Sequence, residues 1–200
     1  HVRENVELFE KAYGRFETLA DSVRFYVNEL FGSEGLMVVD GDDRQLKAQF
    51  APIMKDDILH KNAYQRVKQT NEQLLDLGYK SQAFSRPINF FYLDDFRRRI
   101  ISDGENFSVL DSDIKFTKQE ILSEIDHYPE RFSPNVIMRP VYQEVILPNI
   151  AYLGGPAEII YWLQLKGVFD CYKMSFPVLM PRNFGMIVNQ TTAKKAKKLG

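Results

Sequence analysis

The chain has a single cysteine, Cys171, among its 200 residues. One cysteine cannot form an internal disulfide, and it excludes a zinc site built on a pair of cysteines. We therefore expect a reducing compartment and predict a cytoplasmic protein. A nucleophilic role for Cys171 is disfavoured, because His60 and His127 lie in unrelated segments and a lone helical cysteine is usually a small buried hydrophobe.

Long apolar runs and an excess of one charge are missing as well. No segment approaches the roughly 18 unbroken apolar residues that a membrane-spanning helix needs. The 26 basic and 27 acidic side chains leave a formal net charge of −1. Bulk charge therefore gives no reason to expect nucleic acid or an anionic membrane as a partner. The one basic run, Lys194–Lys198, is interpreted as a solvated helix face.

Apolar residues are plentiful, at 44% of the chain, and suffice for one domain with an insertion. Their three-four spacing predicts one helix from Val6 to Leu30, with Gly32 as its stop. The apolar run from Gly35 to Asp40 predicts a buried parallel strand, whose terminal Asp40 would face a cleft.

The residue pattern in the middle of the chain changes from helical to strand-like. A second helix is predicted after Pro52, ending at Gly78. Short strand-like runs separated by Asp, Gly and Ser then fill residues 83–116, which predicts a small antiparallel insertion.

Two local signals follow the insertion. Thr117 and Glu120 form a capping box for a helix that ends before Pro129, and Ser133-Pro134 is predicted to start the next helix. The overall alternation of helices and strands predicts the α/β class, a parallel sheet with an inserted small α+β connecting subdomain. The predicted divisions are the first part of the core, the connecting subdomain, the second part of the core and the start of a C-terminal helical region, at residues 1–50, 51–132, 133–190 and 191–200.

The strongest site pattern is a strand that passes through Gly154-Gly155-Pro156 into a long apolar helix. The two glycines permit a tight turn and close approach of a ligand, and Pro156 suits the first helical position. The helix start offers N–H groups and positive dipole to an anion. We expect at least one of the glycines at positive φ, and the turn to face an open pocket.

Charged residues near this turn each have two interpretations. Glu158 favours the helix dipole without any function, or it binds a substrate ammonium or transfers a proton. Arg139 and Gln143 share a helical face, where Arg139 would grip a carboxylate or form a buried ion pair. Arg182 ends an apolar strand at the ligand crevice, so we rank it above Arg139 as an anion contact.

Three further candidates are weaker. Tyr161 lies on a helix so apolar that a core position competes with ligand stacking. Lys166 on the same helix must reach solvent along its stem or meet an anion. Asp40, Asp42 and Asp43 suit Mg²⁺ or sugar hydroxyls, but acidic residues in turns are mostly solvated, so no metal site is predicted and Asp40 alone is kept as a substrate contact.

A resemblance to a known family rests on several blocks taken together. They are Ser133–Glu144 (SPNVIMRPVYQE), Leu147–Trp162 (LPNIAYLGGPAEIIYW), Pro177–Asn183 (PVLMPRN), Thr18–Arg24 (TLADSVR) and Phe31–Asp43 (FGSEGLMVVDGDD). Taken together in their order along the chain, they resemble the bacillithiol biosynthesis cysteine-adding enzyme family. The resemblance implies a Rossmann-like fold and an amide-forming ligase that joins L-cysteine to glucosaminyl-malate. The activating cofactor stays open, with ATP or another nucleotide as the candidate.

The resemblance also sharpens the expected site. It favours a functional role for Glu158, which we predict as the catalytic residue. Together with the positions argued above, the predicted substrate-binding residues are Arg139, Gln143, Gly154, Gly155, Tyr161, Lys166, Arg182 and Asp40. Family members are longer, with an earlier glycine-rich strand–turn–helix and a later coiled-coil-like region, so we expect an internal fragment that is inactive alone and a homodimer formed through the C-terminal region. A nucleotidyltransferase-like enzyme and a non-catalytic Rossmann-like binding or scaffold domain are the alternatives.

Overall fold

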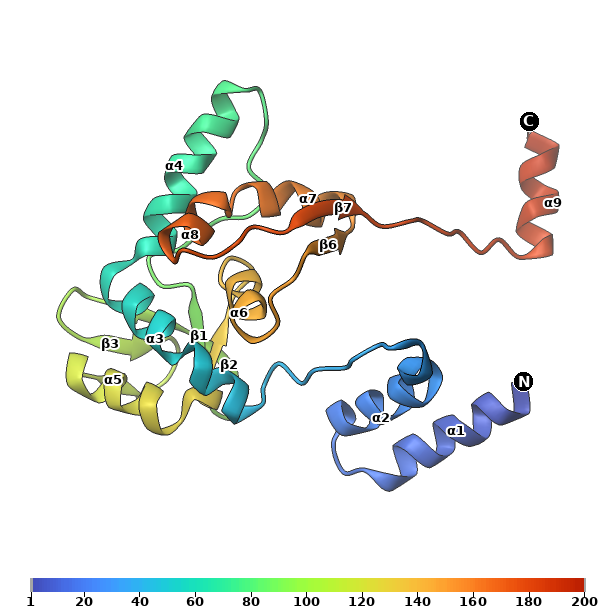
Figure 1. The fold of residues 1–200 in the computed structure, drawn as a ribbon, viewed down its shortest axis with the longest axis horizontal. Helices are drawn as coiled ribbons and strands as arrows, with labels where there is room; N and C mark the ends of the chain where they lie inside the picture. Colours follow the sequence, from blue (N-terminus) through green and yellow to red (C-terminus); the bar gives the residue numbers. More distant parts are fainter. Residues whose placement is uncertain (1, 200) are drawn as a thin grey trace. The chain divides into compact units, whose positions relative to one another are not determined.

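The computed structural model describes residues 2–199 of the chain (Figure 1). These residues fall into two compact units. The first unit joins the chain up to Lys55 with Phe91–Ser133, and the second joins Asp56–Phe90 with the chain from Pro134 onward. The predicted boundaries of core and insertion concern a different division, and they stay predictions.

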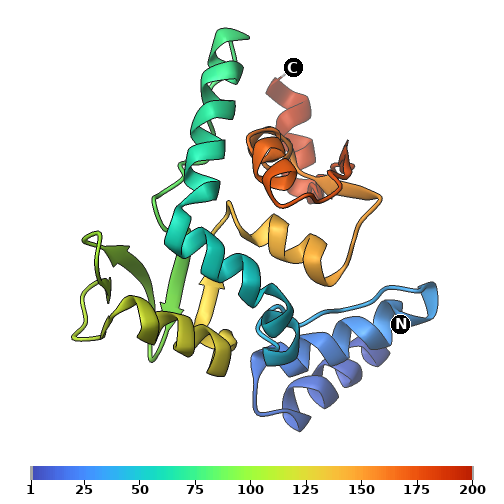
Figure 2. The same cartoon turned by 60° about the vertical axis from the view of Figure 1, so that its left-hand side comes forward.

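The first unit opens with two helices, α1 (Val2–Arg15) and α2 (Leu19–Phe31), packed as a hairpin (Figure 2). The prediction of one continuous helix is therefore wrong. Thr18 is the reason, because its hydroxyl accepts the Asp21 backbone N–H at 3.1 Å and so caps a new helix. The apolar spacing is shared by both helices and did not reveal the break.

The predicted strand after α2 is also wrong. Helix α2 ends at Phe31 with Gly32 as its C-cap, so the predicted stop is confirmed. A 3₁₀ turn, η1 (Gly32–Glu34), follows and ends at Gly35, whose φ is 82°. The apolar run beyond it forms no strand, and Leu36 and Met37 are 47% and 68% exposed. A parallel strand needs a hydrogen-bonded neighbour, and no strand in residues 2–199 pairs with this run.

Two helices follow, α3 (Arg44–His60) and α4 (Asn62–Asp76). Pro52 lies inside α3 instead of preceding it, so the predicted helix starts too late. Lys61, at a φ of +58°, ends the helical backbone between α3 and α4. The predicted stop at Gly78 is confirmed, since this glycine has a φ of +83° after the last turn of α4.

The predicted antiparallel strands are confirmed. They form a sheet in the order β4-β3-β2-β1-β5, with Phe91 opposite Arg99 and Ile100 opposite Val109. The strand bounds are β1 (Phe90–Leu93), β2 (Arg97–Ser102), β3 (Phe107–Val109), β4 (Lys115–Phe116) and β5 (Phe132–Pro134). Alternate residues of the strands are buried, as expected for a sheet covered on one face.

Helix α5 (Lys118–His127) follows β4 and starts with the predicted capping box of Thr117 and Glu120, which is confirmed. It ends before a 3₁₀ turn, η2 (Pro129–Arg131), in agreement with the stop predicted at Pro129. Ser133-Pro134 does not start a helix, because both residues belong to β5.

The second unit continues with α6 (Arg139–Ile146), β6 (Ala151–Gly154) and α7 (Pro156–Leu163). The long helix predicted after the glycines is split, with α8 (Lys166–Cys171) as its second part. The break lies at Gln164, which is fully buried.

Buried polar bonds hold this break in place. The Gln164 Oε1 accepts the backbone N–H groups of Gln82 and Ala83, both at 2.9 Å, and its Nε2 donates to the Asn71 Oδ1 at 2.6 Å. Helix α8 packs on α4, where a Cβ at Gly167 would lie 3.1 Å from the Thr70 hydroxyl. These partners are distant in sequence, so helical periodicity could not predict the break.

The unit ends with β7 (Val178–Pro181), which pairs parallel to β6, and with α9 (Gln190–Leu199). Its core centres on Trp162, which is fully buried against the rings of Phe169 and Phe176. None of the helices between residues 2 and 199 combines the length and the apolarity needed to cross a membrane.

Candidate functional site

The candidate site lies where β6 and β7 end. The two strands run parallel, with Leu153 opposite Met180 and Gly154 opposite Pro181, so their carboxyl ends meet at one edge. The Arg182 backbone N–H donates to the Gly154 carbonyl at 2.9 Å and extends the pairing to the turn. In α/β proteins this edge is where ligands bind.

The predicted strand–turn–helix is confirmed, but the predicted positive φ is wrong. Gly155 is extended, at a φ of −69° and a ψ of 166°, and Gly154 is not among the glycines with positive φ. Space is what requires glycine here. A Cβ on Gly154 would lie 2.7 Å from the Tyr152 Cε1, and one on Gly155 would lie 3.2 Å from the Arg182 Nη2.

Glu158 and Arg182 meet over Gly155. The Glu158 Oε2 lies 3.4 Å from the Cβ position of this glycine, close to the 3.2 Å of the Arg182 guanidinium. Within the described part of the chain, no ion pair within 4.0 Å joins the two charges. The structure thus brings opposite charges to one glycine without pairing them with each other.

Glu158 also has a local role. Its Oε2 accepts the Gly155 N–H at 2.7 Å, which is the half of a capping box that a glycine N-cap allows. The N–H group that we expected to be free for an anion is therefore taken by a carboxylate. A carboxylate has about four lone-pair sites, so Glu158 retains acceptor capacity for a ligand ammonium.

Arg139 lies on the first turn of α6, with Gln143 on the same face as predicted. Its Nη1 donates to the Gln143 Oε1 at 3.4 Å, and its Nη2 donates to the Tyr161 hydroxyl at 3.3 Å. Burial lowers the pKa of Arg139, but the nearby hydroxyls of Tyr161 and Tyr152 outweigh it and the net pKa is raised.

Lys166, a further predicted residue, has a partner of its own. It starts α8, is exposed, and forms an ion pair with Asp170 one turn along the same helix. Asp40 belongs to the first unit.

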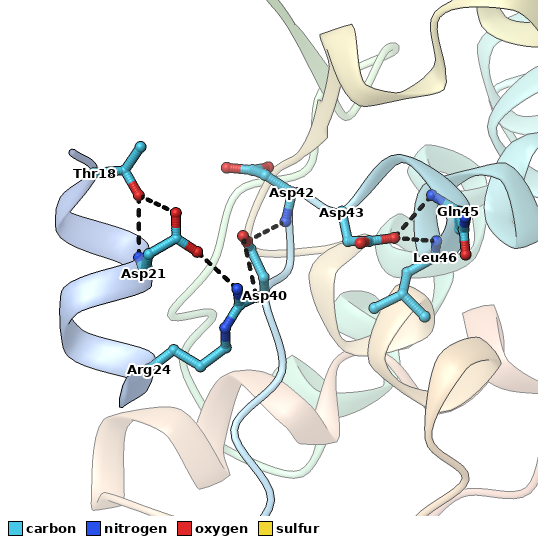
Figure 3. A network of polar contacts seen from close by, with 8 residues as sticks. All are labelled: Thr18, Asp21, Arg24, Asp40, Asp42, Asp43, Gln45 and Leu46. Atoms are coloured by element: carbon cyan, nitrogen blue, oxygen red, sulfur yellow. Dashed lines mark hydrogen bonds and ion pairs between the residues drawn. The ribbon is translucent and has the colours of Figure 1, made fainter. Parts of the chain in front are cut away.

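The loop around Asp40 has internal partners for its carboxylates (Figure 3). The Asp40 Oδ1 accepts the Asp42 N–H at 2.9 Å, and its Oδ2 lies 4.0 Å from Arg24. The Asp43 Oδ1 caps α3 by accepting the N–H groups of Gln45 and Leu46, at 2.8 and 3.0 Å. These bonds make the loop a helix start and an Asx turn.

The remaining carboxylate of the loop also has a partner, because the Asp42 Oδ1 forms an ion pair with the Lys47 Nζ at 2.7 Å. Lys47 is fully buried and also donates to the Glu130 carbonyl at 3.1 Å. Across residues 2–199, no group of three or more His, Cys, Asp or Glu side chains has the arrangement of a metal site.

A family model matches residues 1–183, and its description is "Bacillithiol biosynthesis BshC, N-terminal Rossmann-like domain". The chain belongs to this family. The predicted α/β class and Rossmann-like fold are confirmed by this match, and the family resemblance with them.

Curated relatives agree with the family model. Proteins named "Putative cysteine ligase BshC" from Flavobacterium johnsoniae and Christiangramia forsetii are 45% and 43% identical to this chain, each over 96% of it, and one from Salinibacter ruber is 35% identical over 98%. In each case the match covers 36% of the relative, so the chain spans about a third of their length. All three relatives carry the name of a ligase.

Tyr152 is the site residue that the sequence reasoning missed. It stands in β6 two residues before Gly154, and its ring stacks on Trp162 with centroids 4.0 Å apart. Burial raises the pKa of its hydroxyl, and the neighbouring Tyr161 and Glu158 add to this while Arg139 opposes it. The available signal was its position: alternation in β6 places Tyr152 and Gly154 on one face.

Proposed function

We propose that this chain supplies part of the substrate site of a cytoplasmic BshC-type ligase, which forms an amide between L-cysteine and the amino group of glucosaminyl-malate. The unpaired opposite charges at Gly155 carry the proposal. Free cysteine is a zwitterion, so its carboxylate suits Arg182 and its ammonium suits Glu158. The family match supports the reaction class, and the share of about a third of the relatives' length supports a further contribution to the site from the rest of a full-length protein.

Amide formation requires an activated carboxylate, and a bound nucleoside triphosphate would supply that activation. The residues at the β6–α7 turn do not fit its phosphates, because the Glu158 carboxylate already takes the Gly155 N–H and adds negative charge at the helix start. No step of the proposal therefore passes through a nucleotide at this turn. The chain's own residues bind and orient cysteine here.

The test is thiol profiling of cells that lack the full-length gene. We expect glucosaminyl-malate to accumulate and bacillithiol to disappear, with both reversed by the wild-type gene. Normal bacillithiol in the deletion strain would overturn the proposal. Complementation with a Gly155→Leu variant adds a structural check, because a large side chain there would displace Arg182 and Glu158, and we expect it not to restore bacillithiol.

A further inference from the structure

The guanidinium of Arg139 is held by two uncharged side chains. It donates to the Gln143 Oε1 at 3.4 Å and to the Tyr161 hydroxyl at 3.3 Å. Within residues 2–199, no carboxylate forms an ion pair with Arg139. A guanidinium has five N–H donors, so Arg139 retains its charge and further donors for a ligand. The residue is exposed, and a ligand can therefore reach these donors.

The two partners fix Arg139 from different elements. Gln143 follows Arg139 by about one turn of α6, so this bond orients the guanidinium along its own helix. Tyr161 comes from α7, 22 positions further along the chain. The next residue of α7, Trp162, is fully buried and anchors this helix in the core. The direction of the guanidinium away from its own helix therefore depends on the Tyr161 hydroxyl.

Tyr161 also relates Arg139 to the site at Gly155. It follows Glu158 by three positions on α7. Side chains three apart on a helix share a face, with their Cβ atoms about 5–6 Å apart. One face of α7 thus carries both the carboxylate that suits the cysteine ammonium and the hydroxyl that holds Arg139.

The ligand chemistry at Arg139 differs from that at Gly155. Arg182 has Glu158 beside it, which matches a carboxylate with a neighbouring ammonium. Arg139 donates to a hydroxyl and an amide, which match a carboxylate that carries no ammonium next to it. The malyl group of the acceptor is such a group. It is attached to the sugar carbon next to the one that bears the reacting amine, so its site must lie close to the cysteine site.

We propose that Arg139 binds a malyl carboxylate of the acceptor substrate, and that Tyr161 is a positioning residue that orients the guanidinium for this contact. The inference rests on the proposed function for the identity of that substrate. Tyr161 acts through Arg139. The two arginines then have separate substrates, with Arg182 binding the carboxylate of cysteine and Arg139 that of the acceptor.

The kinetic test uses the full-length enzyme and two acceptors, glucosaminyl-malate and methyl glucosaminide, which keeps the amine and has no malyl group. Arg139→Met should lower kcat/KM for glucosaminyl-malate about 100-fold. Tyr161→Phe keeps the ring and removes the hydroxyl, and should raise the KM for glucosaminyl-malate about 5-fold, with kcat and the KM for cysteine changed less than about 2-fold. With methyl glucosaminide both variants should stay within about 2-fold of wild type.

The matched control is Tyr79→Phe, an exposed tyrosine of the same unit, which should leave every KM unchanged. A purely structural role of Arg139 or Tyr161 would lower activity with both acceptors alike. That result, or an unchanged KM for glucosaminyl-malate in Tyr161→Phe, would overturn the inference.

A binding measurement separates this inference from the proposed function. Calorimetric titration of the full-length protein with L-malate should show binding that weakens about 5-fold in Tyr161→Phe, is lost in Arg139→Met and persists in Arg182→Met. If malate binds in this way but no cysteine adduct forms, the proposed reaction fails and the assignment of Arg139 stands. If the adduct forms but malate binding is indifferent to Arg139, the assignment fails and the reaction stands.

Discussion

In the Gly41–Asp43 loop the carboxylates have partners in the protein, whereas at the β6–α7 turn the charges keep capacity for a ligand. Asp43 caps a helix and Asp42 pairs with a buried lysine. Glu158 and Arg182 lie against one glycine without forming an ion pair, and Arg139 donates to two uncharged groups, Gln143 and Tyr161. Both segments look alike in sequence, as glycine and charge after an apolar run. The difference shows that a charged turn becomes a candidate site only when its charges are left unneutralised.

Substitution of Lys47, the buried lysine that pairs with the loop, should have the largest effect on stability. Lys47→Ala removes a fully buried stem together with its bonds to Asp42 and Glu130, and should lower the free energy of unfolding by about 3 kcal/mol. Urea denaturation of the chain measures this. Lys47→Met is the matched control, since it keeps the stem and should lose only about 1 kcal/mol. Unchanged unfolding of Lys47→Ala would contradict a structural role for the loop.

A third kind of carboxylate, that of Asp57, is shielded from solvent. It is fully buried, and burial raises its pKa from the usual 3.8 to about 6, although the N–H of Ala63 opposes this. The folded state therefore holds the proton more tightly, so stability present below pH 3.8 is lost as the pH rises to about 6. The free energy of unfolding should fall by about 2 to 3 kcal/mol over this range.

The measurement is the free energy of unfolding of wild type and Asp57→Asn across this pH range. Asn cannot ionise, so the difference between the two proteins should follow the titration of Asp57 and become constant above about pH 7. A difference that runs in the opposite direction, with wild type gaining stability as the pH rises, would contradict the raised pKa.

Substitutions at the β6–α7 turn should lower activity and leave stability unchanged. In the full-length enzyme Glu158→Gln or Arg182→Met should lower kcat/KM at least ~10-fold, or roughly 1.4 kcal/mol of transition-state stabilisation. The urea midpoint should stay unchanged, because Gln can still accept the Gly155 N–H. Exposed Lys195→Met serves as the charge-loss control. Poor folding at unchanged specific activity would make Glu158 a helix-start residue and Arg182 a structural one.

The smallest effect is expected at the helix cap of the loop. Asp43→Ala removes the acceptor for two N–H groups at the start of α3 and should cost about 1 kcal/mol of stability, while Asp43→Asn, a good N-cap itself, should cost little. The kcat/KM of the full-length enzyme should not change for either variant. A selective loss of kcat/KM in Asp43→Ala would place the loop in the substrate site and remove the contrast with the turn.

Local chemistry explains which elements could be predicted. The glycine turn into α7, the capping box before α5 and the antiparallel strands of residues 90–116 all follow from residues a few positions apart. Arg139 and Gln143 were placed on one face by the same reasoning, because four residues make about one helical turn. Thr18 was an equally local signal, and the helix break there could have been found from it.

The amino-acid sequence by itself therefore determined the caps, the turns, the strand alternation and the family, because each depends on near neighbours or on a string of residues. Tertiary structure decided the rest. Gln164 breaks its helix through partners more than 80 positions away, and Tyr161 reaches Arg139 only because α6 and α7 converge. Such contacts depend on packing between segments that are distant in sequence, which hydrophobic periodicity and helix propensity do not encode. For the same reason the apolar run from Gly35 to Asp40 looks like a strand in sequence and forms none, since a strand exists only where a second strand pairs with it.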